Sequence, residues 1–163
     1  MDENLSALMR VVGEEIAVYR DLIEHARSKT ALLVRGSLEA ILESNKTDET
    51  FNVKLRILEN ELRRLCCQLC QALNIALEEF TLLKLAEGVG QPAAEELRQQ
   101  TLLFRNLVEQ LKRINQRNRK LVEGSLHYSK GLLDCIANAT SSYESNGLFR
   151  PYSAAHCTIS SKA

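Results

Sequence analysis

A seven-residue rhythm of side chains near the N-terminus constrains this chain more than any other feature. Between residues 5 and 33 the seam positions advance by alternating steps of four and three, and they are Leu5, Met9, Val12, Ile16, Tyr19, Ile23, Ala26, Thr30 and Leu33. A 3.5-residue average held over about four heptads is typical of a helix that supercoils against a partner through one narrow seam. The pattern predicts a helix over about residues 3–35 that packs lengthwise on another helix.

A tight turn and a second seam follow. Gly36 can adopt the left-handed conformation that ends a helix, and Ser37 can cap the next one. The seam resumes with Leu38, Ile41, Phe51, Leu55, Leu58, Leu62, Leu65, Leu69 and Ala72. Residues 44–48 are polar, but steps of three and four pass through positions 44 and 48 without a break. We expect one continuous helix over 37–73, antiparallel to the first because the connection is short.

The remainder of the chain predicts a short helix, a long helix and a tail. Apolar residues over 76–87 lose the heptad step and predict a short helix that covers one end of the hairpin. Gly88 to Pro92 then form a turn, and a third long helix follows over 93–141. Residues 144–163 are rich in Ser, Ala, Gly and Thr, which predicts a mobile tail.

These elements define an all-α fold class. With only two prolines, seven glycines and no Trp, the composition disfavours a turn-rich β protein. The sequence predicts an elongated antiparallel bundle of three long helices, with a short connecting helix and a disordered C-terminal tail. The bundle is expected to occupy residues 1–143 as one domain.

Charge and hydropathy exclude several classes of function. Formal net charge is zero, with 21 basic and 21 acidic residues intermixed, so we expect no nucleic-acid partner. No apolar run approaches the roughly 20 residues needed to cross a bilayer, and no secretory signal follows the acidic start. We therefore expect a cytoplasmic protein without a transmembrane segment.

Candidate chemical sites are few. Cys66, Cys67 and Cys70 cluster within a leucine heptad, without a second Cys or His pair at zinc-site spacing, so we interpret them as core-filling thiols. The three histidines are scattered, and no phosphate-binding glycine loop or paired-carboxylate signature is present. We expect no metal, no cofactor and no enzymatic activity.

The third long helix carries more apolar surface than a hairpin seam needs. One stripe holds Leu97, Phe104, Val108, Leu111, Val122, Leu132 and Ile136, and a second holds Leu103, Leu107, Ile114, Leu121, Tyr128 and Cys135. The second stripe either completes a three-helix core or faces a partner. Two amides, Asn115 and Asn118, lie within this apolar face. They can fix the register of the helix, or form a polar-studded groove that reads a guest helix, and both roles are compatible.

Residues 114–126 also carry a family resemblance. The pattern Ile-Asn-Gln-x-Asn-x-x-Leu-Val-Glu-Gly-x-Leu resembles the C-terminal helix of the FlgN-type flagellar export chaperones. Ile41-x-Glu43-x-x-Lys46, Leu58-Glu59 and Arg63-Arg64 resemble the same family, as does the tail tyrosine Tyr143 followed closely by a glycine.

The resemblance implies a function in flagellar type III secretion. Family members hold the C-terminal helical segments of hook-filament junction proteins, also called hook-associated proteins. They prevent premature assembly and deliver this cargo to the flagellar export apparatus. Carried onto this chain, the expected cargo contacts are Leu111, Asn115, Asn118, Leu121, Val122 and Leu126, with Tyr143 contacting the export machinery.

A purely structural function remains open beside the chaperone. The heptads alone are sufficient for a coiled-coil oligomerisation adaptor with no cargo. In that case the second stripe pairs with another copy of the chain and gives a homodimer.

Overall fold

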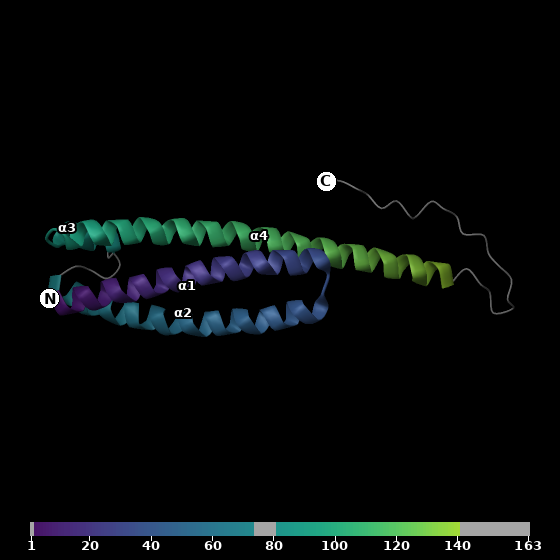
Figure 1. Cartoon of the computed structure of the whole chain (residues 1–163), viewed down its shortest axis with the longest axis horizontal. Helices are drawn as coiled ribbons and strands as arrows, with labels where there is room; N and C mark the ends of the chain where they lie inside the picture. The colour runs from purple at the N-terminus through teal and green to yellow at the C-terminus, as the bar shows by residue number, and fades with distance from the viewer. Residues whose placement is uncertain (1, 74–80, 141–163) are drawn as a thin grey trace. The chain divides into compact units, whose positions relative to one another are not determined.

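The structure, a computed structural model, describes residues 2–73 and 81–140 (Figure 1). These residues form helices only, and in chain order they are α1 (Asp2–Arg35), α2 (Leu38–Leu73), α3 (Leu82–Gly88) and α4 (Ala93–Thr140). The expected all-helical fold with three long helices and a short one is thus observed. The expected tail over 144–163 lies outside the described residues.

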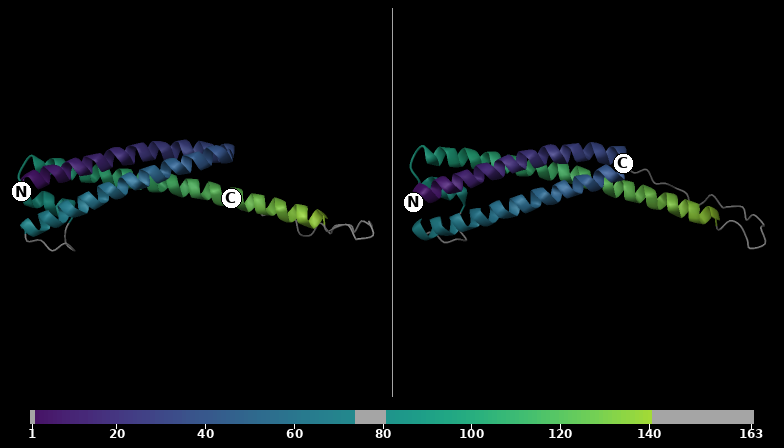
Figure 2. Two further views of the ribbon diagram at one scale, coloured as in Figure 1. Left: turned by 90° about the horizontal axis from the view of Figure 1, so that it is seen from below. Right: turned by 60° about the horizontal axis from the view of Figure 1, so that its bottom comes forward.

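A sharp turn joins α1 to α2. Gly36 has φ +70°, and its N–H donates to the Leu32 carbonyl at 3.0 Å, which closes α1 as the sequence predicts. The Ser37 carbonyl accepts the Ile41 N–H at 3.0 Å, one of the first hydrogen bonds of α2. The two helices lie side by side and run in opposite directions (Figure 2).

The polar stretch of α2 does not break the helix, because it faces polar groups of α1. Ser44 is buried, and its Oγ lies 3.1 Å from Nε2 of His25. Asp48 Oδ1 also lies 3.1 Å from that nitrogen, and Asp48 forms an ion pair with Lys29. The predicted continuity of α2 is confirmed, and the seam passes through positions 44 and 48 as a polar layer.

The prediction of one narrow seam on α1 is wrong. Leu8, Val11, Glu15 and Val18 are buried beside the heptad positions, and they form a second stripe at steps of three, four and three. The reason is that α1 packs against two partners. Its buried side chains belong to one core cluster with residues of both α2 and α4, so a single stripe cannot cover both contacts.

The short helix begins later than the sequence predicts. Thr81 is extended, with φ −137° and ψ 152°, so a helix running unbroken over 76–87 is wrong at this position. The Thr81 hydroxyl accepts the N–H of Lys84 at 3.1 Å and caps α3. Residues 76–80 lie outside the described part of the chain. Leu85 and Ala86 are buried in the core cluster, so α3 covers part of the core as expected.

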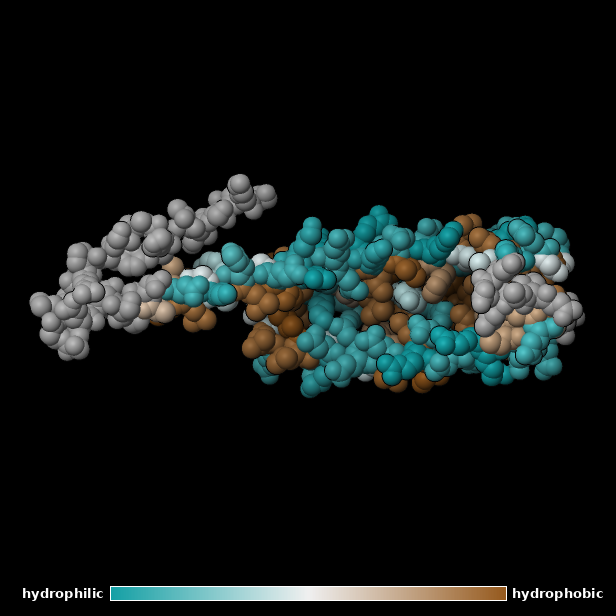
Figure 3. Space-filling model, turned by 180° about the vertical axis from the view of Figure 1, so that it is seen from behind, coloured by the Kyte–Doolittle hydropathy of each residue, from teal (hydrophilic) through white to brown (hydrophobic). Residues whose placement is uncertain are grey.

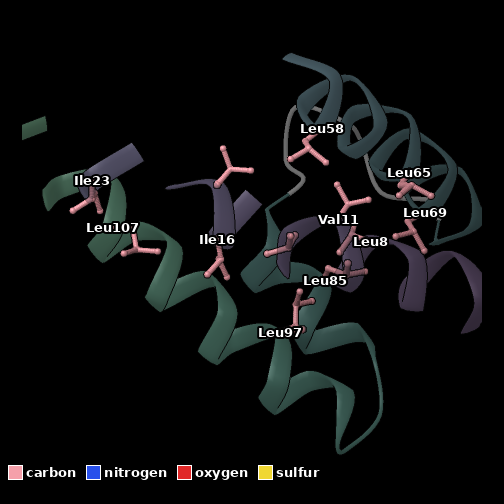
Figure 4. Close-up of a cluster of buried hydrophobic side chains, with 13 residues drawn as sticks. Leu8, Val11, Ile16, Ile23, Leu58, Leu65, Leu69, Leu85, Leu97 and Leu107 are labelled. Carbon is pink, nitrogen blue, oxygen red and sulfur yellow. The ribbon is translucent and has the colours of Figure 1, made fainter. Parts of the chain in front are cut away.

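The core joins all four helices. Figure 4 shows Leu8 and Val11 of α1 close to Leu65 and Leu69 of α2, with Leu85 of α3 and Leu97 of α4 below them. Leu8, Leu85 and Leu97 have no solvent exposure. The described contacts of α4 with α1 increase in residue number together, from Tyr19 with Phe104 to Thr30 with Asn118. The first part of α4 therefore runs in the same direction as α1.

The chain divides into two compact units within α4. The first is Met1–Asn118 and holds the hairpin, α3 and the first part of α4. The second is Arg119–Ala163, of which the structure describes the helical residues up to 140. The core cluster lies entirely in the first unit.

Candidate partner-binding surface

The sequence-predicted contact residues fall into both units. Leu111, Asn115 and Asn118 belong to the first unit, and Leu121, Val122 and Leu126 belong to the second. Tyr143 lies outside the described residues. Three of these seven positions therefore lie in the first unit, three lie in the second, and one lies outside the described residues.

Leu111 and Asn115 differ in burial. Leu111 is half-buried and packs against the core cluster together with Ile114. Asn115 is exposed. In the first unit, the second stripe of α4 contributes to the core through Leu103, Leu107 and Ile114. In this part of α4 the second stripe therefore completes a helical core within the chain.

Asn118 is bound within the chain. It is 7% exposed, and its Nδ2 donates to the Ala26 carbonyl at 2.9 Å. Its Oδ1 accepts the Thr30 hydroxyl at 2.6 Å, and that hydroxyl also lies 3.0 Å from the Ala26 carbonyl. When the nitrogen and the oxygen of a buried amide both form hydrogen bonds to one neighbouring helix, the two helices can pack in only one register without losing these bonds. These contacts support the register-fixing role of Asn118, while a contact with cargo stays a prediction.

Replacing Asn118 with leucine should lower the free energy of unfolding by about 1–2 kcal/mol, because the hydrogen bonds to Ala26 and Thr30 are lost inside the protein. Urea denaturation measures this loss. The matched control is Asn115→Leu, an exposed amide three residues earlier, whose effect should stay within about 0.5 kcal/mol. If Asn118→Leu left stability unchanged and weakened partner binding, the register role would be excluded.

The second unit presents a broad apolar helix face. Val122, Leu126, Leu133 and Ile136 follow one another at steps of four, seven and three, so they share one side of α4. Leu126 and Leu133 are each 66% exposed and Ile136 is 59% exposed. A neighbouring stripe adds Leu121, Tyr128, Leu132 and Cys135. Figure 3 shows hydrophobic and hydrophilic residues together on the surface of this part of α4.

The opposite side of this segment is polar. The exposed residues on this side include both basic and acidic ones, and they are Lys120, Glu123, His127, Lys130 and Asp134. Arg119 Nε donates to Glu123 at 2.7 Å, and this hydrogen bond raises the pKa of Arg119. The segment is thus amphipathic, with an apolar side wide enough for a second helix.

Serine, histidine and aspartate meet in space in the first unit, but not as a catalytic triad. In a triad the carboxylate binds Nδ1 of the histidine, while the serine hydroxyl binds Nε2. Here Ser44 and Asp48 both lie 3.1 Å from Nε2 of His25, and Ser44 is only 6% exposed. This geometry joins α1 to α2 and does not activate a nucleophile.

Two of the three clustered thiols of α2 lie at the core, and the third, Cys67, is half-buried. Cys70 is 4% exposed, and Cys66 packs against the core cluster. Burial raises the pKa of Cys66 to about 11, with the neighbouring thiols adding to the rise. A thiol with a raised pKa is a weak nucleophile at neutral pH. Within residues 2–73 and 81–140, no group of His, Cys, Asp and Glu side chains is arranged to hold a metal ion.

None of the described helices combines the length and the hydropathy that a membrane span requires.

These features are typical of the class of proteins that bind other proteins. The Ser44, His25 and Asp48 side chains join two helices, and exposed apolar side chains form a helix face. Comparison with protein families gives the particular family. The family model described as "FlgN protein" matches residues 1–150, and the chain belongs to the FlgN family. This is a chaperone family of flagellar biogenesis and export. Comparisons with curated proteins and with solved structures found no match.

Proposed function

We propose that this protein is a cytoplasmic chaperone of flagellar type III secretion that binds the C-terminal helical segments of hook-filament junction proteins. Bound cargo is kept from premature assembly and is delivered to the export gate. The family membership supports a flagellar export chaperone, and the exposed apolar face of α4 supports the mode of binding.

The observation that carries the proposal is the exposed face of Val122, Leu126, Leu132, Leu133 and Ile136. Each of these side chains is at least 41% exposed. Covering a half-exposed side chain of this size yields on the order of 1 kcal/mol. Five of them yield about 5 kcal/mol before the cost of ordering the partner, a contribution suited to a complex that must later release its cargo.

The spacing of the face selects the kind of partner. Apolar residues at steps of three and four along a helix are matched best by the same steps on another helix, because ridges and grooves then interdigitate. An amphipathic helix with its own apolar stripe is therefore the expected guest. Charges of both signs on the polar side offer no strong preference for an acidic or a basic guest.

The proposed contacts differ in how accessible they are. Val122 and Leu126 are exposed and Leu121 is half-buried, so these three form the main proposed cargo contacts. Leu111, Asn115 and Asn118 remain proposed contacts in the first unit, with Asn115 the most accessible of them. Tyr143 is the proposed contact with the export machinery.

A binding experiment tests the function. The purified full chain is titrated with C-terminal fragments of the hook-filament junction proteins, and flagellin serves as the control ligand. We expect the junction fragments to bind at least tenfold more tightly than flagellin, a difference of about 1.4 kcal/mol. Equal binding to all ligands, or binding to none, would reject the chaperone proposal.

A second candidate function uses the same face differently. In a structural adaptor, the apolar residues of 119–137 would pair with those of a second copy, giving a homodimer. Light scattering separates the two functions, because a chaperone should give a complex of one chain with one cargo fragment. An obligate dimer whose mass excludes cargo would favour the adaptor.

A further inference from the structure

A carboxyl group lies in the core of the first unit without a basic partner. Glu15 is 4% exposed and shares the second stripe of α1 with Val11 and Val18. Among residues 2–73 and 81–140, no ion pair or hydrogen bond of its carboxyl group is found. A buried carboxylate without a partner is expensive, so the group tends to keep its proton.

The groups around Glu15 favour the protonated form. Burial raises the pKa of Glu15 from 4.5 to about 7, and the negative charge of Glu59 on α2 adds to the rise. Tyr19 on its own helix and Cys66 on α2 also interact with Glu15, and neither supplies a positive charge. At neutral pH the carboxyl group therefore exists in both forms.

A polar atom of α4 lacks a donor. The Oε1 of Gln100 is buried and accepts no hydrogen bond from the described residues. Its Nε2 donates to Glu96 Oε1 at 3.5 Å, which leaves only the oxygen unsatisfied. Buried acceptors without a donor are rare in folded proteins and call for an explanation.

The register of α1 against α4 sets these two groups at the same level. The rings of Tyr19 and Phe104 pack edge to face with centroids 5.0 Å apart. Glu15 precedes Tyr19 by four residues, and Gln100 precedes Phe104 by four. A residue four positions earlier lies on the same face of its helix, one turn away. Because the two helices run in the same direction here, Glu15 and Gln100 occupy matching positions one turn before the ring pair.

On α4, the polar or charged group at this level is Gln100 itself, with the Glu96 carboxylate reached through its amide nitrogen. On α2 it is Glu59 and Cys66, and on α1 it is Tyr19. None of these groups is a cation that could hold Glu15 ionised. The Tyr19 hydroxyl and the Cys66 thiol carry protons, but neither donates a hydrogen bond to the Gln100 amide oxygen, which has no partner among the described residues. The proton of Glu15 is the remaining donor at this level.

We propose that Glu15 in its protonated form donates a hydrogen bond to Oε1 of Gln100 and so links α1 to α4 in a proton-dependent manner. When Glu15 loses its proton, the donor disappears and two acceptors face each other. The packing of α4 residues 93–118 on α1 is then weakened. The fold thus contains a link that senses pH near neutrality.

The direction of the pH effect follows from the raised pKa. A carboxyl group whose folded pKa lies above its unfolded value stabilises the fold at low pH, and this stabilisation is lost as pH rises. The link is complete below about pH 4.5, declines as pH rises through about 7, and is absent in alkali.

A titration of the Glu15 carboxyl carbon by NMR tests the link. In the full chain the midpoint should lie near 7, and in Gln100→Met it should fall by about one pH unit because the protonated form loses its acceptor. Methionine also makes the site less polar, which by itself raises a carboxyl pKa. A midpoint that rises or stays unchanged in Gln100→Met would therefore overturn the proposal. Glu14→Gln, an exposed change next to Glu15, should leave the midpoint within about 0.3 unit.

Hydrogen exchange tests the consequence for α4. Between pH 6 and pH 8.5, protection of amides in residues 93–107 should fall about tenfold after correction for intrinsic exchange rates. In Glu15→Gln the side-chain amide donates at every pH, so the protection should stay constant. The same pH-dependent loss in Glu15→Gln would overturn the proposal, and this readout does not depend on any cargo.

Discussion

Aspartate at both Leu126 and Leu133 should weaken binding of the junction-protein fragments at least about 100-fold, or about 2.7 kcal/mol. Both leucines are 66% exposed on one side of α4 and belong to the proposed cargo face. The double change removes two apolar contacts and places two carboxylates in an apolar interface, where an unpaired charge is costly. Isothermal titration calorimetry measures the affinity.

The matched control is His127→Asp. Position 127 lies roughly 100° around the helix from Leu126, on the polar side, and is also exposed. It adds a carboxylate to the same turn, so its effect on helix formation resembles that of Leu126→Asp. Binding should change less than about threefold in this variant. Circular dichroism should report the same helix content in the unchanged protein, the double variant and the control. Full binding by the Leu126→Asp, Leu133→Asp variant would contradict the proposed cargo face.

Heptad counting could predict the α1–α2 hairpin because its main cause is local in the sequence. Gly36 ends α1 with a positive φ, as its position after the seam indicates. The seam passes through Ser44 and Asp48, which a hydropathy scan alone would assign to a loop. Their partners on α1 are His25 and Lys29, which hold this polar layer together. Counting positions succeeded here where counting apolar residues would have failed.

The second stripe of α1 could not be predicted because α1 needs two stripes only when it packs against both α2 and α4, and α4 lies far along the chain. Leu8, Val11 and Val18 repeat at helical steps, but Glu15 stands between them and marks the stripe as solvent-facing. That side is buried against α2, where Leu8 and Val11 lie close to Leu65 and Leu69. The heptad side of α1 instead meets α4, through Tyr19 with Phe104 and Thr30 with Asn118. The sequence feature that indicates a buried stripe is the set of apolar residues on either side of Glu15. Reading them as buried would also have identified Glu15 as an unusual carboxyl group.

For the candidate site too, some features follow from residues close together in the sequence and others depend on distant residues. The amphipathic face of residues 121–136 follows from spacing alone, and Leu126, Leu132 and Leu133 are exposed as a partner surface requires. The situation of Asn118 depends on Ala26 and Thr30, which lie some 90 positions earlier and carry no mark of an amide partner in the sequence. A seam amide can be recognised from periodicity, but the group that it binds cannot.

Leu97→Ala should lower the free energy of unfolding by about 3 kcal/mol, the largest effect expected from a single change in α4. Leu97 has no solvent exposure and lies in the core beside Leu8 and Leu85, where removing its side chain leaves a cavity between three helices. Leu102→Ala is the control on the same helix, since Leu102 is 55% exposed and should cost less than about 1 kcal/mol. Urea denaturation followed by circular dichroism measures both. A cost below 1 kcal/mol for Leu97→Ala would mean that α4 frays from the hairpin in solution, and then neither the Asn118 contacts nor the Glu15 link could hold it in register.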